Sequence, residues 1–319
     1  MSDTVQDYLK DQGGVTTMGA AIKATSRQKV KRALESELVL RQGRSTLFLP
    51  SVDSRVVAAF VHGGCLTCVS ALEIMGVGLW EHPEHIHLAV SKDYHSRHSS
   101  KVVLHREKWL NSPQSRYWQV LPADCREPHA EDCYSSPYLS SPLHATLRAL
   151  QCVQTHLERV VLLDSVLNKR LVNREILENA AAHLRRQAIQ AALKDCDAAA
   201  RSPLETVGRL QLRERLDAEV KTGVTLKGIG EVDFLIGNLI VEFDGYEYHC
   251  GRAEFDKDRA RSREALLRGF NTMRFTYNDV ISGRFLEPIQ RYLVRGLHEG
   301  PISPGISGDC PQGFRQSRW

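Results

Sequence analysis

The segment VDFLIGNLIVEFDGYEYH, residues 232–249, indicates the fold of the C-terminal part of this chain. Two alternating runs of β-branched, aromatic and other apolar residues flank Gly237 and Asn238, which is the layout of a β-hairpin with a two-residue turn. That turn sets the register of the two strands. The predicted cross-strand pairs are Ile236 with Leu239, Leu235 with Ile240, Phe234 with Val241, and Asp233 with Glu242.

Side chains alternate between the two faces of a strand, so the predicted hairpin has one apolar and one mixed face. The apolar face, expected to pack into the core, comprises Val232, Phe234, Ile236, Leu239, Val241 and Phe243. The mixed face gathers Asp233, Glu242 and Asp244 at the open end. Like charges that face each other destabilise a sheet, so these carboxylates should share a proton or bind a cation. On the spacing alone, solvation at a sheet edge or pairing with nearby arginines is an equally good interpretation.

The neighbouring sequence favours a metal. Carboxylate oxygens on two strands suit Mg²⁺ or Mn²⁺, and His249 follows closely enough to act as a general base or hydrogen-bond donor. Upstream, Ser202 and Glu205 form a capping box, which by itself is sufficient reason for Glu205. Downstream, residues 253–269 are predicted to form a helix that carries most of the basic surplus. A positive rim around a metal pocket is what a phosphodiester substrate requires.

Five motifs occur in one order along residues 200 to 285. They are SPLE (202–205), VDF (232–234), VEFDGYEYH (241–249), FDKDRARSREALLRGF (255–270) and MRFTYNDV (273–280). This series resembles the PD-(D/E)XK endonuclease superfamily, and more closely its branch of uncharacterised domains related to very-short-patch repair endonucleases. The resemblance implies a restriction-endonuclease-like α/β domain that hydrolyses phosphodiester bonds with a metal ion.

The resemblance also implies roles for individual residues. Asp233 and Glu242 match the metal-binding acids of the family, and Glu205 matches the acid that many members supply from the first helix. Asp244 stands where many members carry lysine, which puts a lysine-assisted mechanism in doubt and makes His249 the partner in activating water. A DRxR pattern beginning at Asp258 would position nucleic acid through Arg259 and Arg261, or would form an ion-pair set on a helix surface.

The first fifty residues predict a winged helix-turn-helix module. A short helix over residues 5–12 and a second helix capped by Thr16 or Thr17 precede a third, RQKVKRALESEL (27–38), capped by Ser26. A hairpin around Gly43 follows. The third helix begins with Arg27, Lys29, Lys31 and Arg32, either as a solvated basic face or as a DNA contact. This layout resembles the AbiEi family of antitoxin and abortive-infection proteins.

Residues 51–195 are predicted to be a mixed and then helical connector, with strands over 86–90 and 101–105, and residues 298–319 a disordered tail. The eight cysteines suit free thiols. Cys65 and Cys68 form a lone CxxC, and a zinc site would need a second pair. The nearest candidates (His85, His87, Cys125 and Cys133) have no recognised spacing, so buried apolar thiols and surface or half-buried histidines are expected.

Composition is that of an ordinary globular protein: 319 residues, 42% hydrophobic, 25% charged, with a formal net charge of +4. Neither a signal peptide nor a long apolar run occurs, which predicts a cytoplasmic protein with no membrane partner. The combined expectation is a mixed α/β fold in a bacterial or phage DNA endonuclease, monomeric or homodimeric, that uses Mg²⁺ or Mn²⁺ in phage defence, toxin-antitoxin action or repair. The alternative is a DNA-binding regulator or antitoxin of AbiEi type with a non-catalytic nuclease fold.

Overall fold

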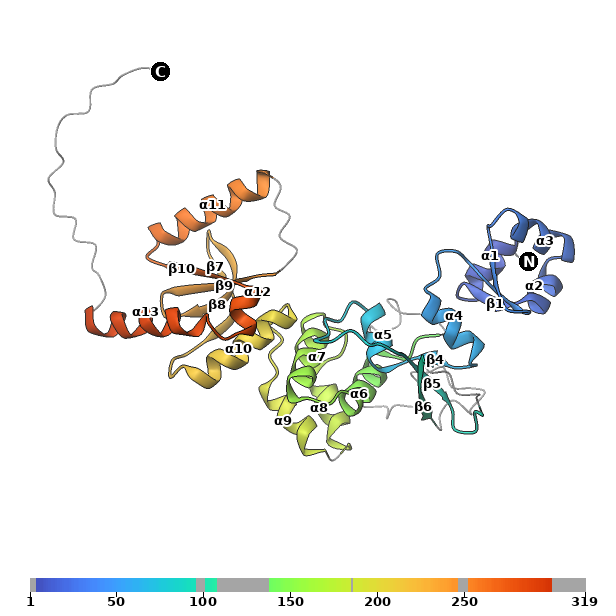
Figure 1. Ribbon diagram of the computed structural model, residues 1–319, viewed down its shortest axis with the longest axis horizontal. Helices are drawn as coiled ribbons and strands as arrows, with labels where there is room; N and C mark the ends of the chain where they lie inside the picture. Colours follow the sequence, from blue (N-terminus) through green and yellow to red (C-terminus); the bar gives the residue numbers. More distant parts are fainter. Residues whose placement is uncertain (1–3, 96–100, 108–137, 185, 246–251, 300–319) are drawn as a thin grey trace, which may run out of the picture.

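The computed structural model describes residues 4–95, 101–107, 138–184, 186–245 and 252–299. These residues form a mixed α/β protein in which three bodies follow one another in chain order (Figure 1). Each body contains one small sheet. The mixed α/β class expected from the sequence is therefore correct.

The N-terminal body packs three helices against a three-stranded antiparallel sheet of order β1-β3-β2. Its elements are α1 (Val5–Asp11), β1 (Val15–Thr17), α2 (Met18–Ala24), α3 (Arg27–Glu35), β2 (Leu40–Gln42) and β3 (Thr46–Phe48). The hydroxyls of Thr17 and Ser26 cap α2 and α3, as predicted. Gly43, with φ of 62°, turns the hairpin. Strand β1 was not expected from the sequence.

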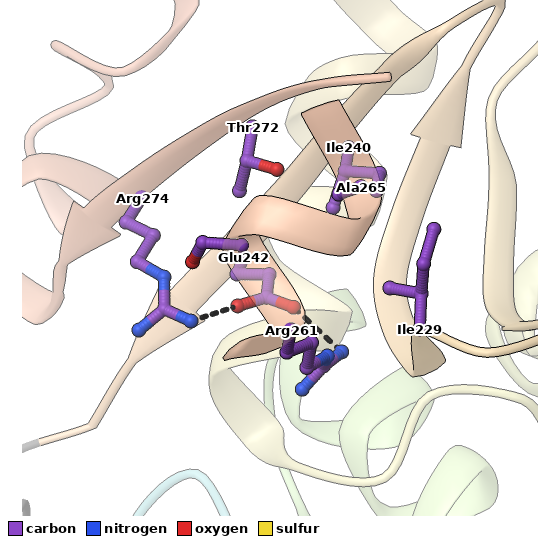
Figure 2. A pocket seen from close by; sticks show the side chains of 8 residues that line it. Ile229, Ile240, Glu242, Arg261, Ala265, Thr272 and Arg274 are labelled. Carbon is purple, nitrogen blue, oxygen red and sulfur yellow. Dashed lines mark ion pairs between the residues drawn. The ribbon is translucent and has the colours of Figure 1, made fainter. Parts of the chain in front are cut away.

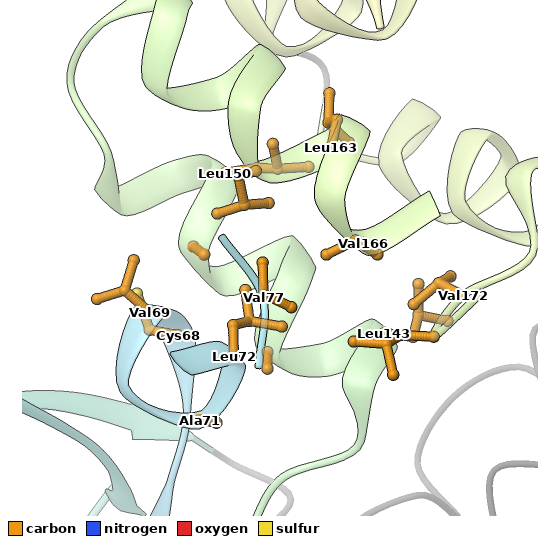
Figure 3. Packing of buried hydrophobic residues seen from close by; sticks show 14 of the residues in the cluster. Cys68, Val69, Ala71, Leu72, Val77, Leu143, Leu150, Leu163, Val166 and Val172 are labelled. Atoms are coloured by element: carbon orange, nitrogen blue, oxygen red, sulfur yellow. The ribbon is translucent and has the colours of Figure 1, made fainter. Parts of the chain in front are cut away.

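The middle body, predicted from the sequence as a mixed and then helical connector domain, has a hydrophobic core of its own. Its elements are α4 (Ser54–Val61), β4 (Cys65–Leu66), α5 (Cys68–Ile74), β5 (Ile86–Ser91), β6 (Val102–Glu107), α6 (Pro142–Cys152), α7 (His156–Asn168), α8 (Arg174–Ala182) and α9 (Gln187–Asp195). Strand β5 lies between antiparallel β4 and parallel β6. Figure 3 shows side chains of α5, α6 and α7, among them Leu72, Leu150 and Leu163, interdigitating in this core.

The C-terminal body is a four-stranded sheet between helices, with strand order β10-β9-β8-β7. Its elements are α10 (Pro203–Arg215), β7 (Lys221–Leu226), β8 (Gly230–Ile236), β9 (Leu239–Asp244), α11 (Arg252–Leu267), β10 (Asn271–Thr276), α12 (Tyr277–Ile281) and α13 (Leu286–Glu299). Helix α11 covers one face, and α10, α12 and α13 lie on the other (Figure 1). The neighbours of the hairpin differ: β10 is parallel to β9, and β7 is antiparallel to β8.

The β8–β9 hairpin confirms most of the predicted register. Gly237 has φ of 60°, and the pairs Ile236–Leu239, Leu235–Ile240 and Phe234–Val241 are all present. The predicted pairing stops there, because the Asp233 carboxylate accepts a hydrogen bond of 2.8 Å from the backbone N–H of Phe243.

The irregularity at Asp233 changes which face one residue occupies. Phe234, Ile236, Leu239 and Val241 pack in the core beneath α10, with Phe243 against them, as predicted. Val232 was expected on the same face, and this expectation is wrong. Val232 instead packs with Ile229, Ile240 and Ala265 on the face that α11 covers.

A buried ion pair joins the middle and C-terminal bodies. Nη2 of Arg209 on α10 lies 2.7 Å from Oδ2 of Asp164 on α7, and both side chains are almost fully buried. The Asp164 carboxylate also accepts from the Thr206 hydroxyl and from the backbone N–H of Asp197. Trp80 of the middle body packs against the C-terminal core. These contacts hold α7 and α10 in a fixed relation.

The predicted disordered tail falls almost wholly outside the described residues, apart from the end of α13 at Glu299. Among the helices that the structure describes, none has both the length and the apolar character needed to cross a lipid bilayer.

Candidate functional site

Arg201, which directly precedes the cap of α10, contacts three carboxylates. Its Nη1 lies 2.9 Å from Oε2 of Glu231, its Nη2 lies 2.9 Å from Oδ1 of Asp233, and its Nε lies 3.9 Å from Oε2 of Glu205. Glu205 belongs to α10, and the other two acids belong to β8. The start of α10 and β8 therefore meet at one guanidinium.

Glu205 is buried, with 6% of its surface exposed. The Ser202 hydroxyl caps α10 by accepting the backbone N–H of Glu205, as the sequence predicts. The Glu205 carboxylate accepts the Ser202 hydroxyl at 3.0 Å and the backbone N–H of Arg201 at 2.9 Å. Burial raises the pKa of Glu205, and the charge of Asp233 raises it further. This carboxylate is thus held beside Asp233 in an environment that favours its neutral form.

Glu242 on β9 lies in a small pocket between the sheet and α11 (Figure 2). Its Oε1 lies 2.7 Å from Nη2 of Arg261, and its Oε2 lies 2.9 Å from Nη2 of Arg274. Arg274 comes from β10, where it is the direct strand neighbour of Glu242. Ile229, Ile240 and Ala265 supply the apolar part of its lining. Both oxygens of this carboxylate are therefore engaged by arginine.

The acids around Asp233 and Glu242 can be compared with the ligands that a divalent cation requires. Carboxylate oxygens from β8, β9 and α10 are the ligand type that Mg²⁺ prefers. Within the described part of the chain, however, these acids do not form a group of three whose oxygens all lie within ligand reach of one another. The donor chemistry fits the ion, and in the structure arginines pair with Asp233 and Glu242.

The other residues predicted for the nuclease site are placed as follows. Asp244 is half-buried at the end of β9, one position beyond Phe243. Arg259 is exposed on α11, whereas Arg261 of the same helix is directed inward to Glu242 and also donates to the backbone carbonyl of Glu231. His249 lies outside the described residues.

Four of the six residues predicted to bind nucleic acid lie on α3. Arg27, Lys29, Lys31 and Arg32 are exposed, while Val30 and Ala33 of the same helix are buried in the N-terminal core. Lys31 also lies 3.7 Å from Glu35, one turn later. The helix therefore presents a basic face to solvent.

A Cys/His cluster in the middle body was missed by sequence reasoning. Cys68, His87, His105 and Cys152 bring their ligand atoms to within 4.8 Å of one another. The sequence paired Cys68 with Cys65, but Cys65 belongs to β4 and is not part of the cluster. His87 was expected to be a surface or half-buried residue, yet it is buried, with 9% of its surface exposed. Their separation along the chain left no spacing signal that could have revealed the group.

Comparison of the chain with models of known protein families and with curated proteins gives no match.

Proposed function

We propose that this protein is a metal-dependent endonuclease that hydrolyses phosphodiester bonds in DNA. The observation that carries the proposal is the convergence of Glu205, Glu231 and Asp233 on Arg201, where α10 meets β8. Concentrating acids in a partly buried place costs stability unless hydrogen bonds or a cation compensate their charge. Catalysis with a divalent cation is a reason to keep them.

In this proposal Asp233, Glu242 and Asp244 hold Mg²⁺ or Mn²⁺, and Glu205 lies behind Asp233. The bound ion would polarise the scissile phosphate and lower the pKa of a water ligand. His249 would orient the attacking water. The pKa of Glu205 is raised by burial and by Asp233, so this carboxyl can keep a proton beside the negatively charged ligands.

The arginines of the site support the same reaction class. Arg201, Arg261 and Arg274 carry charges and planar donor groups that match phosphate oxygens. The buried Nε of Arg261 has no hydrogen-bond acceptor among the described residues. When a metal ion binds the carboxylates, the oxygens of a DNA phosphate would accept hydrogen bonds from these arginines in their place. Arg259, exposed on α11, and the basic face of α3 would bind more of the backbone.

Incubation of the full chain with supercoiled plasmid and Mg²⁺ or Mn²⁺ tests the proposal. Wild type should give open-circular or linear DNA, and Asp233→Asn and Glu242→Gln should lose at least 100-fold in rate, a rough value for removing a metal ligand. Glu287→Gln is the matched control, because Glu287 also pairs with an arginine but lies exposed on α13. Equal cleavage by Glu242→Gln and Glu287→Gln would contradict the proposal.

One observation favours a second candidate, a DNA-binding regulator or antitoxin with a non-catalytic fold. Each described oxygen of Asp233 and Glu242 already has a donor from the protein. On this view the acids are structural partners of the arginines. Mg²⁺ would then leave the melting temperature unchanged. Glu242→Gln would lower the melting temperature, because the neutral amide cannot accept hydrogen bonds from both Arg261 and Arg274 as the carboxylate does. Binding of DNA would persist and would weaken in a Lys29→Gln, Arg32→Gln variant.

A further inference from the structure

Four ligand-type side chains meet in the middle body, far from the acids of the C-terminal sheet. Cys68 is the first residue of α5, His87 lies on β5, His105 lies on β6, and Cys152 is the last residue of α6. Four separate elements thus each contribute one side chain to the same place. In the parallel pairing of β5 and β6, His105 is opposite Ala89, so the two histidines are diagonal neighbours.

The distances in this cluster are close to those of a tetrahedral metal site. Nδ1 of His87 lies 3.1 Å from Nε2 of His105 and 3.8 Å from Sγ of Cys152, and all four ligand atoms lie within 4.8 Å of one another. Four ligands around zinc, with bonds of about 2.0 to 2.3 Å, lie roughly 3.3 to 3.8 Å apart. A contraction of about 1 Å at the widest separation would complete the tetrahedron.

We propose that Cys68, His87, His105 and Cys152 form a closed, four-coordinate Zn²⁺ site. Two thiolates and two imidazoles are a donor set that selects Zn²⁺ over Mg²⁺ or Mn²⁺. The charges also balance, because two thiolates neutralise one Zn²⁺ and the site lies where unpaired charge would be costly. Cys68 is fully buried and His87 nearly so.

The surroundings hold these ligands in place. The backbone N–H of Thr67 donates to the carbonyl of His87 at 3.1 Å, and the backbone N–H of His87 donates to the Ser70 hydroxyl at 2.9 Å, so the start of α5 is tied to β5. Cys68 itself has φ of 56°, a left-handed conformation that residues with a Cβ rarely adopt. The chain thus adopts an unfavourable backbone angle at the residue whose thiol joins the cluster.

Neutral imidazole and thiolate are the forms that coordinate zinc, so binding of the ion would release the protons of the Cys68 and Cys152 thiols.

Full coordination by the protein makes this a structural site. It would join the start of α5, two strands of the β4–β5–β6 sheet and the end of α6, elements that otherwise meet through the apolar core shown in Figure 3. Because four protein ligands leave no open position, the ion would not bind substrate. The site is independent of the nuclease proposal.

Zinc content of the full-length chain tests the site directly. The protein is expressed with Zn²⁺, dialysed, and analysed for metal by mass spectrometry. Wild type should retain one equivalent of zinc, and Cys152→Ala and His105→Asn should lose at least nine-tenths of it. Cys65→Ala is the matched control, because Cys65 is equally buried in the same CxxC but lies outside the cluster. Retention of zinc by Cys152→Ala, or a metal-free wild type, overturns the proposal.

Two measurements on wild type remain decisive if a variant fails to fold. Replacement of zinc by Co²⁺ should give the visible bands of a tetrahedral ion and a thiolate charge-transfer band. Alkylation mapped by mass spectrometry should spare Cys68 and Cys152 until a chelator is added. Octahedral Co²⁺ bands, rapid alkylation of Cys152 in the zinc-loaded protein, or a Cys68–Cys152 disulfide in freshly purified protein would each overturn it.

Discussion

Arg201 is the residue on which the interpretation of the acidic site depends most directly. It is the common partner of Glu205, Glu231 and Asp233, and its side chain is partly exposed, so it can leave the site without breaking the fold. A guanidinium and a divalent cation both lower the energy of clustered carboxylates, and they cannot occupy the same space. The residue therefore competes with the metal in the proposed reaction.

Replacing Arg201 by Gln should therefore make the protein bind Mg²⁺ more tightly. Loss of the guanidinium leaves more uncompensated negative charge on Asp233 and its neighbours, which favours a divalent cation. The check is the rise in melting temperature as Mg²⁺ is added, which should reach half its maximum at a roughly tenfold lower concentration than in wild type. Arg291→Gln, at an exposed pair on α13, should leave this midpoint unchanged. An unaltered midpoint in Arg201→Gln would argue that no cation binds here.

The Asp164–Arg209 pair contributes to stability, because both side chains are buried away from water. Asp164→Asn should lower the free energy of unfolding by about 3 to 5 kcal/mol, since it leaves the Arg209 charge buried without a counterion. Urea denaturation measures the change. Glu178→Gln, which removes an exposed i,i+4 partner of Arg174, should cost less than about 0.5 kcal/mol. Similar losses in the two variants would contradict the assigned burial.

Among the elements, α10 and β9 approach each other at Gly208. A Cβ at this position would lie 1.9 Å from Cε2 of Phe243, which is far inside van der Waals contact. Glycine in a helix interior costs about 1 kcal/mol relative to alanine, so the close approach is the reason for its presence. Phe243 stands between Glu242 and Asp244, and α10 carries Glu205, so this contact fixes how closely α10 approaches the strand that carries the other two acids.

Gly208→Ala should destabilise the protein by about 1 to 2 kcal/mol, because overpacking outweighs the gain in helix propensity. Phe243→Leu in the same chain should recover part of the loss, as it shortens the side chain that blocks the new methyl group. Gly19→Ala on α2 is the control, since nothing lies within 4 Å of its Cβ position, and it should be neutral or stabilising. Chemical denaturation of the four proteins gives the comparison.

Local elements were predictable from the sequence because their causes are local. Gly237 at the turn and Ser202 as the N-cap of α10 act through backbone conformation and hydrogen bonds within a few residues, and both are confirmed. The predicted capping box is confirmed only in this half, because the Glu205 carboxylate accepts the backbone N–H of Arg201 instead of that of Ser202. Strand β1 escaped notice because three residues carry too little periodicity. The sequence predicts the wrong face for Val232 because the backbone N–H of Phe243 donates to the Asp233 carboxylate and interrupts the alternation.

The contacts of the candidate sites could not be predicted, because they join distant parts of the chain. The acids of the hairpin were found by their own pattern, whereas their pairing with Arg201 and Arg274 depends on how α10 and β10 pack on it. Cys68 and Cys152 belong to different elements and share no motif. Composition and periodicity describe what a segment prefers, and only packing decides which segments meet.

For the whole molecule, the separation of the cores predicts how it unfolds. The N-terminal body has an independent core, whereas Trp80 and Leu157 of the middle body pack against the C-terminal core and Asp164 binds Arg209. Calorimetry should therefore give two transitions, a small one for the N-terminal body and a large one for the other two together. Asp164→Asn should shift the larger transition only. Three transitions in wild type would show that the middle and C-terminal bodies are not coupled.

The Asp164–Arg209 pair also decides where this chain can be recombined with others. The sequence suggests a domain boundary at residue 196, but dividing the chain there separates α10 from α7 and breaks the Asp164–Arg209 ion pair. In a chimera joined at this residue, the replacement for the middle body would have to supply a buried counterion for the Arg209 guanidinium. A domain exchange should therefore keep α7 and α10 in the same fragment. The smallest transferable unit then begins at or before α7, well upstream of the strands that carry the acids.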